Sequence, residues 1–265
     1  MFIRARFVAS WGVKLKVCVV IPVYNHWLVL RELLASIEHH GVDCFLVDDG
    51  SNAECAAEIQ HLGESFDWVF TDRLAVNAGK GAAVLRGLAL AQEKDYSHAL
   101  QIDADGQHDL GDIDRFFALA RRYPHNLILG MASYDDSVPV SRYYGRFVTH
   151  FWVWVNTLSL QVKDSMCGFR VYPIAETLEV CKHASVGLRM EFDIEVVVRM
   201  SWAGVKFTSL STHVTYPQDG ISHFDMFKDN VRISGTHAKL FFGMLIRLPL
   251  ILFRRLWPGA RKATG

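Results

Sequence analysis

Residues 17–22, VCVVIP, and residues 44–47, CFLV, are short apolar runs, and the second leads directly into the polar residues DDGS. Between them, apolar residues recur at helical spacing over residues 27–40, and Gly41 follows as a helix stop. Continuous apolar runs of this length are typical of strands buried on both faces of a parallel sheet. The stretch therefore predicts a β-α-β unit.

The same alternation continues along the chain. It predicts strands at 68–71, 98–102 and 127–130 and helices at about 80–93 and 111–122. It weakens after residue 140, although alternating side chains predict one more strand at 205–216. We expect an α/β fold, with a Rossmann-like, mainly parallel sheet flanked by helices. The predicted organisation is an N-terminal extension (1–16), one domain (17–235) and a C-terminal appendage (236–265).

Composition narrows the classes of partner and the compartment. The 265 residues include 28 basic and 28 acidic side chains, so no net field favours nucleic acid, and we expect no nucleic-acid partner. The five cysteines are scattered without a CxxC pair, which argues against a disulfide framework or a zinc site and favours a reducing compartment. Residues 1–16 lack an apolar stretch of signal-peptide length.

The C-terminal segment 239–257 combines aromatic, aliphatic and basic residues. Arg247 and Pro249 interrupt its apolar stretch, which is shorter than the roughly 20 residues that a membrane-spanning helix needs. The pattern predicts an amphipathic helix at the membrane interface, with a core-packing helix as the alternative. The aromatic run at 150–154 fits core packing or contact with a lipid tail.

Polar residues that follow strands lie at the carboxyl edge of such a sheet, where ligands bind. The sequence DADGQH at 103–108 brings two carboxylates and an amide to that edge, a donor set that suits a hard divalent cation. The alternative is a simple polar turn at Asp105 and Gly106.

Two further polar segments occupy similar positions. The DDGS at 48–51 offers carboxylates to a nucleobase or ribose, or forms an Asx turn with Ser51 or Asn52 capping the next helix. The NAGKG at 77–81 places glycines and Lys80 at the start of a helix, where backbone N–H groups can approach a nucleotide and Lys80 can offset its charge. It is not a P-loop, because the Walker spacing is absent.

Taken in order, these segments resemble the family 2 glycosyltransferases with the GT-A fold, above all the dolichol-phosphate mannosyltransferase-like members. The resemblance covers about residues 17–225. It includes IPVYN at 21–25, DSMCGFR at 164–170, FDIE at 192–195 and GISHF at 220–224, besides the three segments above.

The resemblance implies roles for the matching positions. On the donor side it implies nucleotide-sugar binding by Pro22, Tyr24, Asn25, Asp48, Asp49, Lys80, Asp103 and Ala104. It implies a Mg²⁺ or Mn²⁺ cofactor held by Asp103, Asp105 and Gln107. On the acceptor side it points to Gly168, Phe169, Arg170, Ser222 and His223, where His223 replaces the lysine usual in the family.

The acceptor decides which further groups the reaction needs. A hydroxyl acceptor must lose a proton, and Asp164 is then the candidate base, listed with Asp105 as catalytic. A phosphate acceptor is already anionic and needs cations, for which Arg142, Arg146 and Arg170 are candidates. Of Asp193 and Glu195, only one is expected to face the cleft.

The resulting expectation is an inverting, metal-dependent transfer of a hexose from a nucleotide-diphosphate sugar to a membrane-associated, lipid-linked acceptor. We expect polyprenyl phosphate as the acceptor and peripheral association with the cytoplasmic face of the membrane. The alternatives are a hydroxyl of another lipid or glycan, and a non-catalytic nucleotide-sugar-binding module. A nucleotidyltransferase is disfavoured because the chain lacks an early G-x-G motif.

Overall fold

The computed structural model describes residues 15–133, 140–215 and 226–256, with the backbone alone for 140–144, 226 and 255–256. Structural statements below refer to these residues.

A seven-stranded sheet forms the centre of the molecule, in the order β3-β2-β1-β4-β6-β5-β7. Its strands are β1 (Val17–Val23), β2 (Cys44–Asp48), β3 (Val69–Arg73), β4 (His98–Gln101), β5 (Asn126–Ser133), β6 (Arg170–Pro173) and β7 (Lys206–His213). Only β6 is antiparallel to its neighbours in this sheet, β4 and β5. The prediction of a mainly parallel, Rossmann-like sheet is confirmed, whereas β6 was not predicted.

Helices cover both faces of the sheet. One face carries α1 (Leu30–Glu38), α2 (Ala53–Ser65) and α4 (Ile113–Arg122), the last preceded by a 3-10 turn, Leu110–Asp112. The other carries α3 (Lys80–Glu93), α6 (Ile174–Lys182) and α7 (Phe192–Ala203). Strand β1 supplies Val19 and Ile21 to one core and Cys18 and Val20 to the other, because successive strand side chains point to opposite faces.

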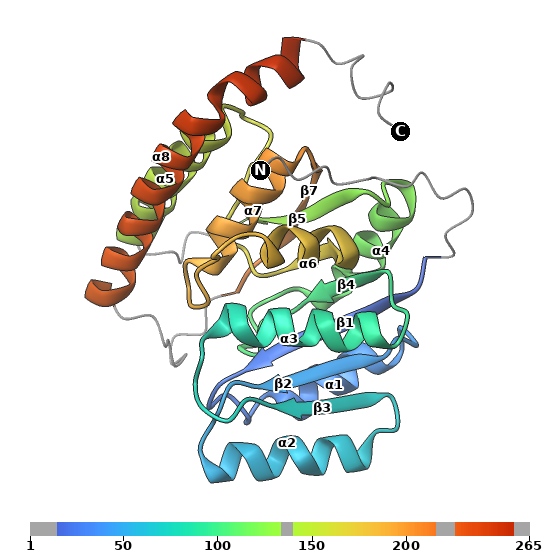
Figure 1. Cartoon of the computed structure of the whole chain (residues 1–265). Helices are drawn as coiled ribbons and strands as arrows, with labels where there is room; N and C mark the ends of the chain where they lie inside the picture. Colours follow the sequence, from blue (N-terminus) through green and yellow to red (C-terminus); the bar gives the residue numbers. More distant parts are fainter. Residues whose placement is uncertain (1–14, 134–139, 216–225, 257–265) are drawn as a thin grey trace.

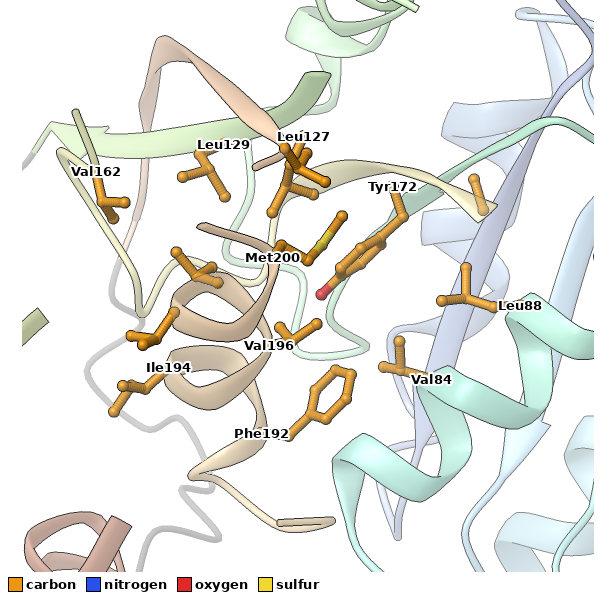
Figure 2. Packing of buried hydrophobic residues seen from close by; sticks show 14 of the residues in the cluster. Val84, Leu88, Leu127, Leu129, Val162, Tyr172, Phe192, Ile194, Val196 and Met200 are labelled. Carbon is orange, nitrogen blue, oxygen red and sulfur yellow. The ribbon is translucent and has the colours of Figure 1, made fainter. Parts of the chain in front are cut away.

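The second core fills the space between the sheet and α3, α6 and α7. Tyr172 of β6, Phe192 and Met200 of α7, and Leu88 of α3 meet there (Figure 2). All four are fully buried. This packing fixes the start of α7 against α3, which brings residues from the two helices together at the site described below.

Two long helices lie beside α7, away from the sheet. Helix α5 (Val140–Thr157) and helix α8 (Met226–Leu256) pack side by side (Figure 1). Helix α8 directs Leu240 and Met244 into the core and leaves Phe242 (64% exposed) and Ile246 (80% exposed) on its outer side. It thus has two apolar faces, of which only one is buried. The predicted boundary at residue 235 lies within this helix.

The length of α8 changes the expectation for the C-terminal segment. The stretch Phe227–Arg254 is long and apolar enough to cross a membrane, judged by length and composition alone. A core helix of a soluble protein can pass the same test. The expectation that the apolar stretch is too short therefore does not hold for the helix as a whole.

Candidate functional site

Three polar segments meet at the carboxyl edge of the parallel strands. The residues after β4 lie beside the loop after β2 and the start of α3, because β4, β1 and β2 are adjacent and parallel. The fold thus gathers the predicted segments at 48–51, 77–81 and 103–108 in one region. In α/β folds, ligands usually bind just outside the carboxyl ends of the parallel strands.

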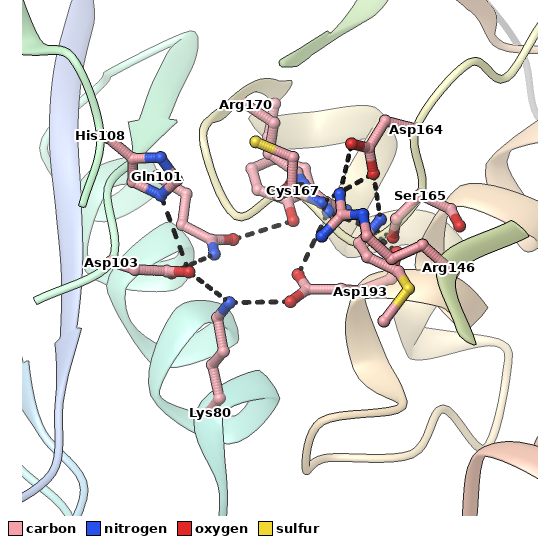
Figure 3. A network of polar contacts seen from close by, with 12 residues as sticks. Lys80, Gln101, Asp103, His108, Arg146, Asp164, Ser165, Cys167, Arg170 and Asp193 are labelled. Atoms are coloured by element: carbon pink, nitrogen blue, oxygen red, sulfur yellow. Dashed lines mark hydrogen bonds and ion pairs between the residues drawn. The ribbon is translucent and has the colours of Figure 1, made fainter. Parts of the chain in front are cut away.

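Lys80 is at the centre of this region. Its Nζ donates to Asp103 Oδ2 at 2.9 Å and to Asp193 Oδ2 at 2.8 Å (Figure 3). Burial alone lowers the pKa of Lys80, but the two adjacent carboxylates outweigh it and raise the pKa well above its usual value. Lys80 is therefore a fixed cation that joins α3, the β4 loop and α7.

Asp103 is held from several sides. Gln101 Nε2 donates to its Oδ1 at 3.0 Å, and the hydroxyl of Tyr172 donates to Gln101 Oε1 at 3.0 Å. Burial raises the pKa of Asp103, yet Lys80 and His108 hold it well below its usual range. Gly168 passes directly over this carboxylate, since a Cβ there would lie 2.1 Å from Asp103 Oδ2. Gly168 is thus required for close approach of two loops.

Asp105 differs from Asp103 in its surroundings. Its Oδ1 accepts a hydrogen bond from the backbone N–H of Gln107 at 3.1 Å. Burial raises its pKa above the ordinary value, and the charge of Asp103 adds to the effect. A cation beside Asp105 would therefore stabilise its charged form. Ala104, between the two carboxylates, points into the core.

The donor set fits a metal that a substrate helps to hold. Among the described residues, no group of three or more His, Cys, Asp and Glu side chains is arranged to bind an ion. Mg²⁺, however, is commonly held by one or two carboxylates together with the phosphate oxygens of a substrate. Asp103 and Asp105 supply such carboxylates on one loop, and Gln107 follows them.

His108 borders the same site and received no role from the sequence. Its ring stacks on Phe169 at 4.9 Å between centroids, and its Nε2 lies 3.8 Å from Asp103 Oδ2. Neither ring nitrogen has a hydrogen-bond partner among the described residues. The loop that carries the carboxylates is thereby packed against the 164–170 loop.

Asp164 forms a second cluster, between α5 and the loop before β6. Its carboxylate accepts hydrogen bonds from Arg146 and from the backbone N–H groups of Ala132, Met166 and Cys167, and His150 Nε2 lies 3.5 Å away. Burial raises its pKa, but His150 and Arg146 hold it well below the usual range. A carboxylate so stabilised in its ionised form is a weak base. The geometry thus counts against the predicted base role.

Two predicted acceptor residues are buried. Arg170 is fully buried, and its guanidinium donates to the carbonyl of Cys167 and, at 3.0 Å, to that of Asp193 (Figure 3). Phe169 is also fully buried and packs against Phe116. Direct contact with an acceptor, as expected from the resemblance, does not fit these positions. Both side chains instead fix the shape of the 164–170 loop.

The segment at 48–51 is also engaged internally. Asp48 is buried, accepts from Ser51 N at 2.8 Å and pairs with Arg73 at 2.6 Å. Asp49 accepts from the N–H groups of Ala78 and Gly79, although burial still raises its pKa. The two carboxylates therefore hold the donor-side loops in shape. A nucleotide that bound either carboxylate, as expected, would compete with these internal hydrogen bonds.

The other donor-side residues lie nearby. Pro22 is buried within β1, and Asn25 adopts a positive φ of 54° with its Oδ1 accepting from Asn52 N. Tyr24 is half-buried beside it. Asn52 also caps α2 by accepting from Cys55 N at 2.9 Å, as one of the predicted alternatives requires. The β1 and β2 loops are thus joined at the sheet edge.

Three of the predicted acceptor residues fall where the structure describes no side chain. Ser222 and His223 lie outside the described residues. Arg142 lies in α5, one turn before Arg146, and its side chain is not described.

Of the FDIE carboxylates, only Asp193 reaches the cluster. Glu195 is fully buried, accepts from Gly187 N at 2.9 Å and pairs with Arg199 and Lys239. Sequence reasoning assigned no role to His150, although its position four residues after Arg146 places both on one side of a helix. Lys80 and Asp193 are 113 residues apart, and no local pattern signals their pairing.

Comparisons with known proteins agree with this architecture. The dolichyl-phosphate beta-glucosyltransferase of Dictyostelium discoideum is 23% identical over 252 residues, covering 86% of this chain and 74% of that protein. The polyprenol monophosphomannose synthase of Mycolicibacterium smegmatis is 24% identical over 234 residues, covering 81% and 82%.

The fold is similar to that of a solved structure. The structure of S. aureus TarS 1-349 in complex with UDP-GlcNAc superposes with a TM-score of 0.55 at 14% identity, covering 85% of this chain and 66% of that one. The chain spans 37% of a longer TarS structure. The likeness shows a GT-A fold.

The model of the family described as glycosyl transferase family 2 matches residues 18–172, more than half of the chain and the part that contains Lys80, Asp103, Asp105 and Asp164. The protein therefore belongs to glycosyl transferase family 2.

Proposed function

We propose that this glycosyltransferase moves a hexose, with inversion and with a divalent metal, from a nucleotide-diphosphate sugar to polyprenyl phosphate at the cytoplasmic face of a membrane. The contrast between two clusters carries the proposal: carboxylates gather around Lys80 on the donor side, while cationic and N–H groups gather around Asp164. The names of two relatives, which refer to dolichyl phosphate and to polyprenol monophosphomannose, support this acceptor class. The UDP-GlcNAc complex of TarS supports a nucleotide-sugar donor.

On the donor side, Asp103, Asp105 and Gln107 would hold Mg²⁺ or Mn²⁺. When bound, such an ion stabilises the negative charge of a departing diphosphate. Lys80 keeps Asp103 ionised and fixes its position through the 2.9 Å contact. Asp193 holds Lys80 from the opposite side at 2.8 Å, so the cation cannot turn away from the loop.

On the acceptor side, the surroundings of Asp164 indicate whether the acceptor is a hydroxyl or a phosphate. A hydroxyl needs a base, and the low pKa of Asp164 makes it unsuited to that task. A phosphate needs no base and is attracted by cations, and Arg146 lies on α5 beside the loop. The cluster therefore favours polyprenyl phosphate over the alternative, a hydroxyl of another lipid or glycan. The presence of Asp105 and Gln107 favours an active enzyme over a non-catalytic binding module.

A transfer assay tests the proposal. Purified protein is incubated with UDP- and GDP-sugars, Mn²⁺ or Mg²⁺, and either a polyprenyl phosphate or the corresponding polyprenol. We expect product from the phosphate alone, and loss of activity with EDTA that added metal restores. Equal transfer to polyprenol would contradict the proposed phosphate acceptor. Transfer in the presence of EDTA would contradict the proposed need for a metal.

The variant Asp105→Asn should lower kcat by about 100-fold or more, because it removes a charge from the proposed metal site. The matched control is Asp109→Asn on the same loop, where the exposed side chain accepts from Gly111 N at 3.0 Å. Control activity should stay within about twofold of the wild type. Similar losses in both variants would indicate a folding defect of the loop.

Peripheral membrane association is a separate part of the proposal, supported by exposed apolar side chains on the adjacent helices α5 and α8. The triple variant Phe242→Ser, Ile246→Ser and Phe253→Ser should abolish sedimentation with vesicles of neutral and anionic phospholipid, since all three side chains are more than half exposed. Leu160→Ser, which changes an exposed leucine elsewhere, is the control. Unchanged sedimentation of the triple variant would reject docking through α8.

A further inference from the structure

The segment 184–191 connects α6 to α7 and touches the donor-side turn at 77–80. Arg189 Nη1 donates to Asn77 Oδ1 at 2.8 Å, and its Nη2 donates to the carbonyl of Asn77 at 3.3 Å. The N–H group of Ala82, in the first turn of α3, donates to the carbonyl of Gly79 at 2.9 Å and also to the carbonyl of Leu188 at 3.2 Å. Arg189 thus holds both the side chain and the backbone of the residue that begins this turn.

The contact is close enough to require glycine. Gly79 has a φ of 108°, and a Cβ there would lie 2.4 Å from the carbonyl oxygen of Leu188 and 2.6 Å from Arg189 Cγ. Gly79 directly precedes Lys80, which binds Asp103 and Asp193. A shift of the segment would therefore be transmitted to the fixed cation of the site.

The other end of the segment is tied to α8. Lys239 of α8 donates to the carbonyl of Ser185 and lies 2.9 Å from Glu195 Oε1. Glu195 in turn accepts from Gly187 N at 2.9 Å and from Arg199 Nε at 2.7 Å. Glu195 is fully buried, so its partners hold it in one position. One side of the segment is thus bonded to α8 and the other to the donor-side turn.

We propose that Arg189 and Lys239 are positioning residues for nucleotide-sugar binding: Lys239 fixes the segment 184–191, and Arg189 fixes the turn that presents Lys80. This inference rests on the proposed function only in taking the turn as part of the donor site. The hydrogen bonds and ion pairs of the two side chains are with Asn77, Ser185 and Glu195, outside the Lys80 and Asp164 clusters. The effect is on donor binding, with little effect on the chemical step.

The test measures donor KM, kcat and the Kd for UDP and GDP in the full chain. Arg189→Ala should raise donor KM and nucleotide Kd about tenfold, the loss expected for a charge-assisted hydrogen bond, with kcat within about twofold. Arg189→Lys should recover only part of the loss, because an ammonium lacks the planar fork that reaches both oxygens of Asn77. Arg31→Ala, which removes an exposed pair with Glu58, is the control.

Lys239→Ala should weaken nucleotide binding about threefold, and Lys239→Arg should restore it. The double variant Arg189→Ala, Lys239→Ala should bind no more weakly than Arg189→Ala alone, because both act through one segment. Additive losses, or a fall in kcat with unchanged KM, would overturn the proposal.

Hydrogen exchange provides a readout without nucleotide. In Lys239→Ala the amides of Ala82 and Ala83 should exchange about tenfold faster, while those of α1 stay unchanged. If the wild type binds neither UDP nor GDP, the proposed function fails. The exchange rates of the Ala82 and Ala83 amides still test whether Lys239 positions the turn. Unchanged exchange in a folded variant would refute it.

Discussion

The Lys80 cluster and the Asp164 cluster are both buried and charged, but they are built in opposite ways. Around Lys80, the carboxylates of Asp103 and Asp193 share one ammonium group, and Asp105 lies beside them with a raised pKa. In the second cluster, the single carboxylate of Asp164 pairs with Arg146 and accepts hydrogen bonds from three backbone N–H groups. The first cluster thus holds more carboxylates around its ammonium group, whereas in the second the hydrogen-bond donors outnumber the single carboxylate. In the function proposed above, the first cluster would serve a metal-bound donor and the second a phosphate acceptor.

The largest effect is expected from removing the shared cation. Lys80→Ala leaves Asp103 and Asp193 as facing carboxylates with less than a quarter of either side chain exposed. Loss of one partner of a buried ion pair costs about 3–5 kcal/mol of unfolding free energy. We also expect kcat/KM to fall by about 100-fold or more. Urea unfolding and donor kinetics check this, and a stable, active variant would break the comparison.

Asp164→Asn should give a smaller loss of activity, within about tenfold, because a phosphate acceptor needs no base. A loss of about 1,000-fold with normal folding would instead identify Asp164 as the base. Acceptor kinetics with polyprenyl phosphate decide between the two outcomes.

We also expect the stability difference between the wild type and Asp164→Asn to depend on pH. The folded pKa of Asp164 is depressed, so its carboxylate stabilises the fold fully above the unfolded value of about 3.9 and loses this effect as the pH falls through the folded pKa. Near pH 7, Asp164→Asn should be less stable by on the order of 2 kcal/mol, and the gap should narrow in acid. Urea unfolding from pH 7 to pH 3 measures it. If the difference in unfolding free energy widens in acid, the folded protein does not lower the pKa of Asp164.

The smallest effect is expected at an exposed pair on the same helix as Lys80. Arg86 of α3 binds Asp72 at 2.7 Å, with 41% and 27% of the two side chains exposed. Solvent screens this pair, so Arg86→Ala should change the unfolding free energy by about 0.5 kcal/mol or less and leave donor KM unchanged. A large loss would show that the sensitivity of Lys80 reflects α3 in general and not the buried cluster.

Much of the fold could be predicted from local patterns. Strands β1 and β2 and helix α3 follow from apolar runs and helical spacing, and Lys80 begins α3 as the glycines at 79 and 81 suggest. Strand β6 was missed because its four residues, RVYP, include a buried arginine and carry no alternation. Its antiparallel place between β4 and β5 depends on pairing between distant segments.

The sequence by itself determined the parallel α/β class, the position of the polar segments at the ends of strands, and the presence of an apolar C-terminal helix, because these depend on the periodicity of neighbouring residues. Only the tertiary structure decided that Lys80 binds Asp193, that Arg170 is buried, that Asp164 is held by Arg146, and that Lys239 of α8 binds the carbonyl of Ser185. Burial and electrostatic pairing between groups far apart in the chain set these features, and spacing along the sequence carries no record of them.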